Sequence, residues 1–257
     1  MFFGLELSGL QIYWWIIVSL LGGLLVFMFF VQGGQSLLHI IAKDELEKTM
    51  LINSLGRKWE LGFTTLVLFG GACFAAFPLF YSVSFGGAYW VWLMILFCFI
   101  IQAVSYEYRK KEGNLLGSKV YEVFLWINGV FGVFLIGVAV STFFSGSHFV
   151  LDSRNFVEWS KASRGLEALL EPANYLLGLS LVFLNVGLGN SAFYPSIADL
   201  QSSLTIQNAS SSYYTLSVMS YVSLLVPFVL AYIAYVWRAM DRVKITKEEM
   251  SNDTHAY

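Results

Sequence analysis

Two carboxylates and an arginine, Glu60, Glu107 and Arg109, flank a pair of long apolar segments and are the side chains best placed to do chemistry. Glu60 comes shortly before the apolar run 63–81. Glu107 and Arg109 come shortly after the run 89–104. Each run approaches the roughly 20 residues that a helix needs to cross a bilayer. A chain that crosses twice returns to the side where it began, so we expect the three charges at one face of a membrane.

Two roles stay open for these charges. A carboxylate at the mouth of a membrane helix can relay protons inward when burial raises its pKa toward neutral. Alternatively, the acids are solvated charges at helix ends, and Glu60 interacts with the positive end of the helix dipole. Charges at helix ends cost little free energy, so the residues alone favour the second role. Arg109 either pairs with one of the two acids or anchors its helix end at the membrane surface.

A third polar site lies at the end of the first apolar run, where the sequence is Gln32-Gly-Gly-Gln35. Amides are costly against lipid, so these side chains could face a partner or a cavity. A simple helix exit explains the same pattern, because glycine and polar residues commonly follow a helix, and we favour it.

The composition identifies the class of protein that must position these residues. Hydrophobic residues make up 57% of the chain and charged residues only 12%, against about 25% charged residues in soluble domains. We therefore predict an all-α, polytopic transmembrane helix bundle that forms one integral membrane domain over residues 1–257. The net charge of −2 gives no indication of a nucleic-acid partner. Cys73, Cys98 and His39 lack the companions that a metal or haem site needs, so we expect no metal site.

Five membrane spans are predicted, and the crossing of a sixth segment is left open. The five cover residues 12–31, 63–81, 89–104, 121–144 and 213–236, and the sixth is 175–188. A glycine-containing turn at 84–87 should join the second and third spans, and 43–58 should be a polar loop. The small residues of the fourth span favour close helix packing, and Pro227 interrupts the last span.

The distribution of basic residues gives an orientation. The loops after the first and third spans are basic, which predicts an external N-terminus and a cytoplasmic C-terminal tail. If 175–188 also crosses, the basic tail falls on the external side. Either that segment does not cross, or an odd number of helices is absent between residues 177 and 189.

Several blocks of the sequence resemble subunit II of cytochrome bd-type quinol oxidases. The similarity is carried by IYWW, by MLINSLGRKWELGFTTLVLFGGACFAAFPLFYSVSFGGAYW, by QAVSYEYR, by INGVFGVFLIGVAVSTFFSG and by FYPSIADLQSSLTIQNASSSYYTLSVMSYVSLLVPFVLAY. The blocks keep the order of the family and cover most of the chain. Family members are longer, with further helices before the FYPS turn, which coincides with the region where the charge pattern fails.

The resemblance implies a redox-silent subunit in the bacterial cytoplasmic (inner) membrane. The partner, subunit I, holds haems b and d and oxidises quinol, and the complex reduces dioxygen to water. Subunit II holds no haem and supports assembly, and in some members it lines a proton or oxygen route or holds a structural quinone. The chain is then an enzyme only as part of the complex. Its partners are subunit I, membrane lipid and quinone, and a small accessory peptide is left open.

The resemblance also assigns roles to residues. Trp59 and Glu60 match a family Trp followed by an acid that has been linked to a proton path, and Glu107 matches a second acidic position. Gln32 and Gln35 stand where many members carry acids. An amide does not exchange a proton at physiological pH, which weakens a route through the first span.

Two alternatives remain. A membrane transporter domain would show inverted repeats and polar breaks at mid-membrane, and the acids here lie at helix ends instead. A shortened, nonfunctional remnant of the same subunit would share the family and lack its activity.

Overall fold

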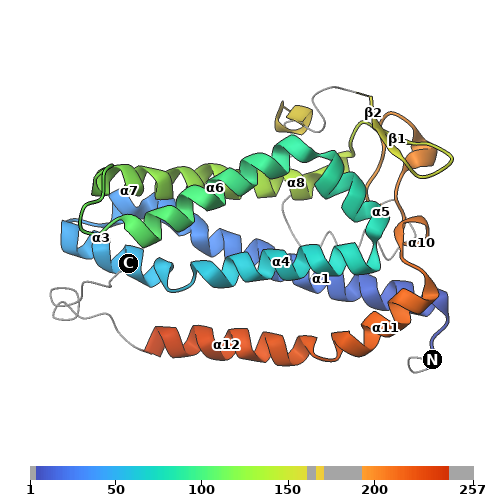
Figure 1. Ribbon diagram of the computed structural model, residues 1–257, viewed down its shortest axis with the longest axis horizontal. Helices are drawn as coiled ribbons and strands as arrows, with labels where there is room; N and C mark the ends of the chain where they lie inside the picture. Colours follow the sequence, from blue (N-terminus) through green and yellow to red (C-terminus); the bar gives the residue numbers. More distant parts are fainter. Residues whose placement is uncertain (1–3, 161–165, 171–192, 243–257) are drawn as a thin grey trace. The chain divides into compact units, whose positions relative to one another are not determined.

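The computed structural model describes residues 4–160, 166–170 and 193–242 (Figure 1). Five helical segments within them are long and apolar enough to cross a membrane, which confirms the five predicted spans. These segments are Leu7–Ile41, Glu45–Ala76, Tyr89–Tyr108, Ser118–Phe143 and Tyr213–Arg242. The sixth segment, 175–188, lies outside the described residues, as does the whole region 177–189 where helices were expected to be absent.

The hairpin between the second and third spans differs from the prediction. Helix α4 (Trp59–Ala76) ends before Pro78, and a short helix α5 (Pro78–Tyr81) and a π-helical segment η2 (Ser82–Gly87) follow it. A continuous helix to Tyr81 is therefore wrong, and so is a simple turn at 84–87. Proline disfavours helical geometry in the residue before it, and Phe77 accordingly has φ −131° and ψ 66°. Helix α6 (Tyr89–Tyr108) then forms the third span.

The predicted polar loop at 43–58 is mostly helix α3 (Glu45–Gly56). Asp44 caps it, because its carboxylate accepts a hydrogen bond of 2.7 Å from the backbone N–H of Glu47. Acidic residues in the first turn also favour the start of a helix. The charged residues of this stretch suggested a loop, and its buried side has no apolar run to indicate a helix, because it consists of Thr49, Ile52, Asn53 and Gly56.

The helices divide into two compact units. Unit 1 comprises residues 1–27, 65–93 and 135–226, and unit 2 comprises residues 28–64, 94–134 and 227–257. The remaining elements are α1 (Leu7–Gln32), η1 (Gly33–Leu37), α2 (Leu38–Ile41), α7 (Ser118–Ile127), η3 (Asn128–Gly132), α8 (Val133–Ser145), β1 (Phe149–Leu151), β2 (Val157–Trp159), η4 (Leu166–Leu170), η6 (Leu200–Ser202), α10 (Ile206–Ala209), α11 (Tyr213–Ser223) and α12 (Val226–Arg242).

Aromatic rings fill the core of unit 1. Trp15 packs against Phe193 with ring centroids 4.3 Å apart, and Phe80 meets the same ring edge-on at 5.1 Å. Tyr194 stacks on Phe149 of strand β1 at 5.3 Å, and burial raises the pKa of Tyr194 to about 12. Such ring pairs fix orientation as well as burying apolar area.

Strands β1 and β2 form a small antiparallel hairpin in unit 1, with Phe149 opposite Trp159. Its turn is fixed by Asp152, whose carboxylate accepts hydrogen bonds of 2.8 Å from the backbone N–H groups of Arg154 and Phe156. The hydrogen bond from Phe156 holds the pKa of the Asp152 carboxyl below its usual range.

Hydroxyl and amide groups join α11 to the first half of α1 within unit 1. The indole N–H of Trp14 donates to Ser220 Oγ at 2.9 Å, and Gln11 Nε2 donates to Ser210 Oγ at 2.7 Å. The last span is broken between α11 and α12, and Pro227 is the second residue of α12. The predicted interruption at Pro227 is thus confirmed.

Close backbone approach characterises unit 2, where the 3₁₀ segment η1 meets the π-helical segment η3. A Cβ atom added at Gly129 would lie 2.7 Å from the backbone nitrogen of Ser36 and 3.1 Å from Cβ of Gln35. The predicted tight packing of the fourth span holds at this glycine. In contrast, a Cβ at Gly137 on α8 would meet no atom within 4 Å.

These two glycines allow a matched test of the packing. We expect Gly129→Ala to lower the stability of the purified chain by about 1–3 kcal/mol, because η1 and η3 must separate to admit the methyl group. Gly137→Ala should leave stability unchanged or raise it, since alanine favours a helix and meets no neighbour. Thermal unfolding in detergent, followed by circular dichroism, measures both. Equal unfolding temperatures for the two variants would contradict this account of the packing.

Candidate functional site

The predicted acids lie at the surface of the described structure. Glu60 is exposed in the first turn of α4. Glu107 is also exposed and pairs with Lys111 one helical turn away. Trp59 is partly buried, and its ring stacks on that of Tyr106 with centroids 6.4 Å apart. The structure thus places both acids on the surface of the chain, and places Trp59 in the packing.

Arg109 pairs with neither of these acids. Its Nε and Nη2 groups donate hydrogen bonds to Oε1 of Glu122, at 3.1 and 2.7 Å. The two side chains are only 4% and 3% exposed. Lys48 of α3 donates to the other carboxylate oxygen, Oε2, at 3.1 Å. A single buried carboxylate on α7 therefore holds two cations, one from α3 and one from the end of α6.

The cluster is close to neutral in charge. Lys48 also donates to the carboxylate of Glu45 at 2.7 Å, so two cations face two anions. A buried carboxylate is tolerated only when charges and hydrogen bonds compensate it. In Arg109, Nη1 is buried and has no hydrogen-bond partner in the described structure, so the compensation is incomplete at one atom.

The loop between α6 and α7 brings Arg109 and Glu122 together. Asn114 donates to the carbonyl oxygen of Arg109 at 3.0 Å and accepts from the backbone N–H of Gly117 at 2.5 Å. Gly117 has a φ of 80°, a conformation that favours glycine. The turn therefore starts α7 where Glu122 faces back toward the end of α6.

Buried amides form a second polar group in unit 2. Gln102 Nε2 donates to Oε1 of Gln32 at 3.0 Å, and Gln35 Nε2 donates to Oδ1 of Asn128 at 3.0 Å. The hydroxyl of Tyr106 donates to Oε1 of Gln35 at 3.1 Å. The simple helix exit favoured from sequence is thus wrong for Gln32 and Gln35, because both side chains are buried and paired inside the protein.

The backbone departs from α-helical geometry at two of these amides, Gln35 and Asn128. The α-helical path of α1 ends at Gln32 and tightens to the 3₁₀ segment η1, which holds Gln35. Asn128 begins the π-helical segment η3, and its Nδ2 donates to the carbonyl oxygen of Cys98 at 2.9 Å. π-Helical turns inside α-helices are frequent at functional sites, because they redirect one side chain.

On α6 the two polar groups share one buried face. Gln102, Tyr106 and Arg109 are spaced four and three residues apart, so they follow one another along that face. Amides donate and accept hydrogen bonds but do not carry protons at neutral pH. The arrangement is therefore suited to fixing helices against one another. It provides a continuous acid–base relay only if ordered water supplies the missing links.

Comparison with known proteins decides the family. A sequence profile described as cytochrome bd terminal oxidase subunit II matches residues 10–194. The chain belongs to the cytochrome bd terminal oxidase subunit II family. The first four blocks of sequence that suggested this resemblance lie within the matched range, and the FYPS block begins at its end.

Curated members of the cytochrome bd subunit II family are similar to part of the chain. The probable cytochrome oxidase subunit 2 of Haemophilus influenzae is 33% identical over 141 residues, which are 54% of this chain and 37% of that protein. The cytochrome bd-I ubiquinol oxidase subunit 2 of Escherichia coli K12 is 28% identical over 144 residues, or 56% and 38%. The cytochrome bd ubiquinol oxidase subunit 2 of Bacillus subtilis is 30% identical over 145 residues, or 54% and 42%. The match thus spans about two fifths of the length of each relative.

The family name implies haems in the complex, and the two histidines among the described residues are poorly placed to ligate one. His39 is exposed at the end of the first span, and His148 is half-buried outside the spans. Neither lines the cavity between α3 and α12 of unit 2, or the small cavity beside Ser84 and Tyr194 in unit 1. Within the described residues no three His, Cys, Asp or Glu side chains gather as a metal site. Haem ligation requires an axial side chain that faces a cavity.

Removing the buried carboxylate tests its structural role. We expect Glu122→Gln to destabilise the chain by about 3–5 kcal/mol, because Arg109 is left buried without its counter-charge and Lys48 keeps only the exposed Glu45. Glu107→Gln is the matched control, since its pair with Lys111 is exposed and screened by water. The yield of monodisperse protein and its unfolding temperature in detergent are the measurements.

A double variant separates lost pairing from misfolding. Arg109→Gln combined with Glu122→Gln removes one cation together with the carboxylate, so part of the lost stability should return. An unfolding temperature for Glu122→Gln equal to that of Glu107→Gln would show that the ion pair does not hold α6 to α7.

Proposed function

We propose that this chain is the haem-free integral subunit of a bd-type quinol oxidase, which packs beside a haem-bearing subunit I in the bacterial inner membrane. The complex oxidises quinol and reduces dioxygen to water, and haems b and d belong to the partner. The family match over residues 10–194 is the observation that carries this proposal. The poor fit of His39 and His148 to haem ligation supports the assignment of the haems to the partner.

The first part of the role is assembly. Helix α12 presents aromatic side chains to its surroundings, with Phe228 72%, Tyr232 64% and Tyr235 71% exposed. An exposed apolar face of this kind suits lipid or another membrane subunit. The paired polar groups of unit 2 keep α3, α6 and α7 in register, so that the apolar surfaces of these helices are presented in fixed positions.

The second part is proton access through Glu60 and Glu107. We infer from the basic loops that both acids lie at the cytoplasmic side, with the N-terminus outside, where the oxidase would take up protons. Their exposure supports a role in collecting protons from water. Glu122 is different, because two cations hold its charge in place, and we assign it to structure. Buried Gln32 and Gln35 argue against a route along the first span.

Purification of the tagged chain from its native membrane tests the assembly proposal. We expect a haem-bearing membrane subunit to co-purify in a one-to-one ratio, with the visible absorption bands of haems b and d, and quinol-dependent oxygen consumption. Separation of the two subunits should leave the haem with the partner. Stoichiometric haem on this chain alone would overturn the proposal.

Replacement of Glu60 tests the proton role in the intact complex. Glu60→Gln should slow quinol-dependent oxygen consumption by about a hundredfold, because the amide does not exchange protons, while Glu60→Asp retains most of the rate. Haem content should stay constant in both variants. Lys119→Gln, another change to an exposed charge, is the control. Unchanged turnover in Glu60→Gln would remove Glu60 from the path.

A further inference from the structure

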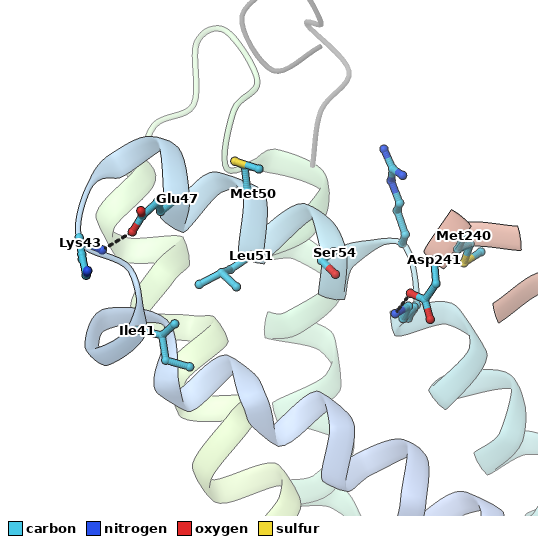
Figure 2. A pocket seen from close by; sticks show the side chains of 10 residues that line it. Ile41, Lys43, Glu47, Met50, Leu51, Ser54, Met240 and Asp241 are labelled. Carbon is cyan, nitrogen blue, oxygen red and sulfur yellow. Dashed lines mark hydrogen bonds and ion pairs between the residues drawn. The ribbon is translucent and has the colours of Figure 1, made fainter. Parts of the chain in front are cut away.

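A cavity of about 680 Å³ lies in unit 2, at the ends of three membrane-spanning segments (Figure 2). Ile41 ends the first segment, α3 begins the second, and Met240 and Asp241 lie in the last two turns of α12. Ligand sites in proteins commonly have volumes of about 300–1,000 Å³, so the cavity is large enough for part of a lipid. It is separate from the buried ion pair and amides, which contribute no residue to its lining.

The lining has an apolar part and a charged part. The apolar part consists of Ile41, Met50, Leu51 and Met240. Methionine side chains adapt to irregular ligands such as acyl chains. The charged part contains three cations, Lys43, Arg57 and Lys58, and two anions, Glu47 and Asp241, so the lining carries a net positive charge.

The two anions are already engaged. Asp241 pairs with Lys58, whose ammonium also lies 4.5 Å from the ring centre of Trp237. Glu47 accepts a hydrogen bond of 2.8 Å from the backbone N–H of Lys43 (Figure 2). The ammonium of Lys43 makes no ion pair within the described residues and is exposed at the rim of the cavity. A ligand that enters therefore meets positive charge at the rim and apolar side chains beside it.

We propose that this cavity binds one anionic phospholipid, with its phosphate at Lys43 and the start of an acyl chain against Met50, Leu51 and Met240, while Arg57 at the other end of α3 adds positive charge to the lining. Basic pockets between membrane helices suit anionic headgroups, and each nearby Lys or Arg contributes about 1 kcal/mol. Ser54 supplies a hydroxyl donor on the same wall. A zwitterionic lipid or a neutral quinone gains less from the excess positive charge. The proposal does not depend on the oxidase function.

Native mass spectrometry of the purified, delipidated complex that contains this chain tests the site. The probes are phosphatidylglycerol and phosphatidylcholine with the same acyl chains. We expect tighter retention of one phosphatidylglycerol, about fivefold weaker binding in Lys43→Gln, and about thirtyfold weaker binding in Lys43→Gln/Arg57→Gln. Lys119→Gln, an exposed lysine outside the cavity, should bind as the unaltered protein does.

A second measurement uses the unaltered protein and so does not depend on how the variants fold. Phosphatidylglycerol that carries a diazirine near the start of one acyl chain should label Met50, Leu51 or Met240, as located by peptide mass spectrometry. Labels confined to other segments would overturn the proposal. Equal retention of phosphatidylcholine would also overturn it. Displacement of the lipid by equimolar inorganic phosphate or by quinone would show that the site takes those molecules instead.

Discussion

One buried carboxylate, Glu122, largely determines how unit 2 is held together. Lipid tails are as apolar as leucine side chains. Hydrophobic contact therefore does not determine which helices pack together in a membrane. A buried carboxylate does determine the packing, because its charge must be compensated by cations. Glu122 pairs with Arg109 at the end of α6 and with Lys48 on α3, so one side chain fixes both helices to α7. The amides of Gln32, Gln35, Gln102 and Asn128 repeat this principle with neutral groups.

In unit 1, the packing of the core is determined by aromatic rings and not by a buried charge. Its core consists of aromatic rings, with Phe193 in contact with both Trp15 and Phe80, and its polar contacts are hydrogen bonds between uncharged groups, such as Trp14 to Ser220. Aromatic shape determines which rings fit, so no charge has to be buried. The contrast lies in the chemistry of the two cores, because the buried ion pair of Arg109 and Glu122 lies in unit 2.

The spans could be predicted from the sequence because hydropathy is a sum over many residues and tolerates local errors. The local errors were at positions where one residue decides the outcome. Pro78 ends α4 inside an apolar run, and Asp44 starts α3 inside a polar one. Mean hydropathy detects neither, although proline and N-cap rules would have found both.

Glu122 was missed for a related reason. It stands near the start of an apolar run, where a charge normally lies in water, so nothing about its immediate neighbours indicates burial. The available signal was spacing. In the fourth span, Glu122 on α7 and Asn128 at the start of η3 are six residues apart, and on α6 Gln102, Tyr106 and Arg109 follow one another at spacings of four and three. Two polar stripes on successive helices predict a shared polar seam, and the pairing of Arg109 follows from that seam and not from proximity in sequence.

The basic segment before the second span shows why counting charges gives orientation but not mechanism. Lys48, Lys58 and Lys43 contribute equally to a positive-inside count. In the structure Lys48 is committed to Glu122, Lys58 is committed to Asp241, and only the ammonium of Lys43 is directed to the cavity rim without an ion pair in the described residues. Lysines that count equally toward orientation thus have different roles in the folded protein: Lys48 in helix packing, Lys58 in pairing at a helix end and, in our proposal, Lys43 in lipid binding. Loss of one lysine should affect one of these roles, because the three ammonium groups face different partners.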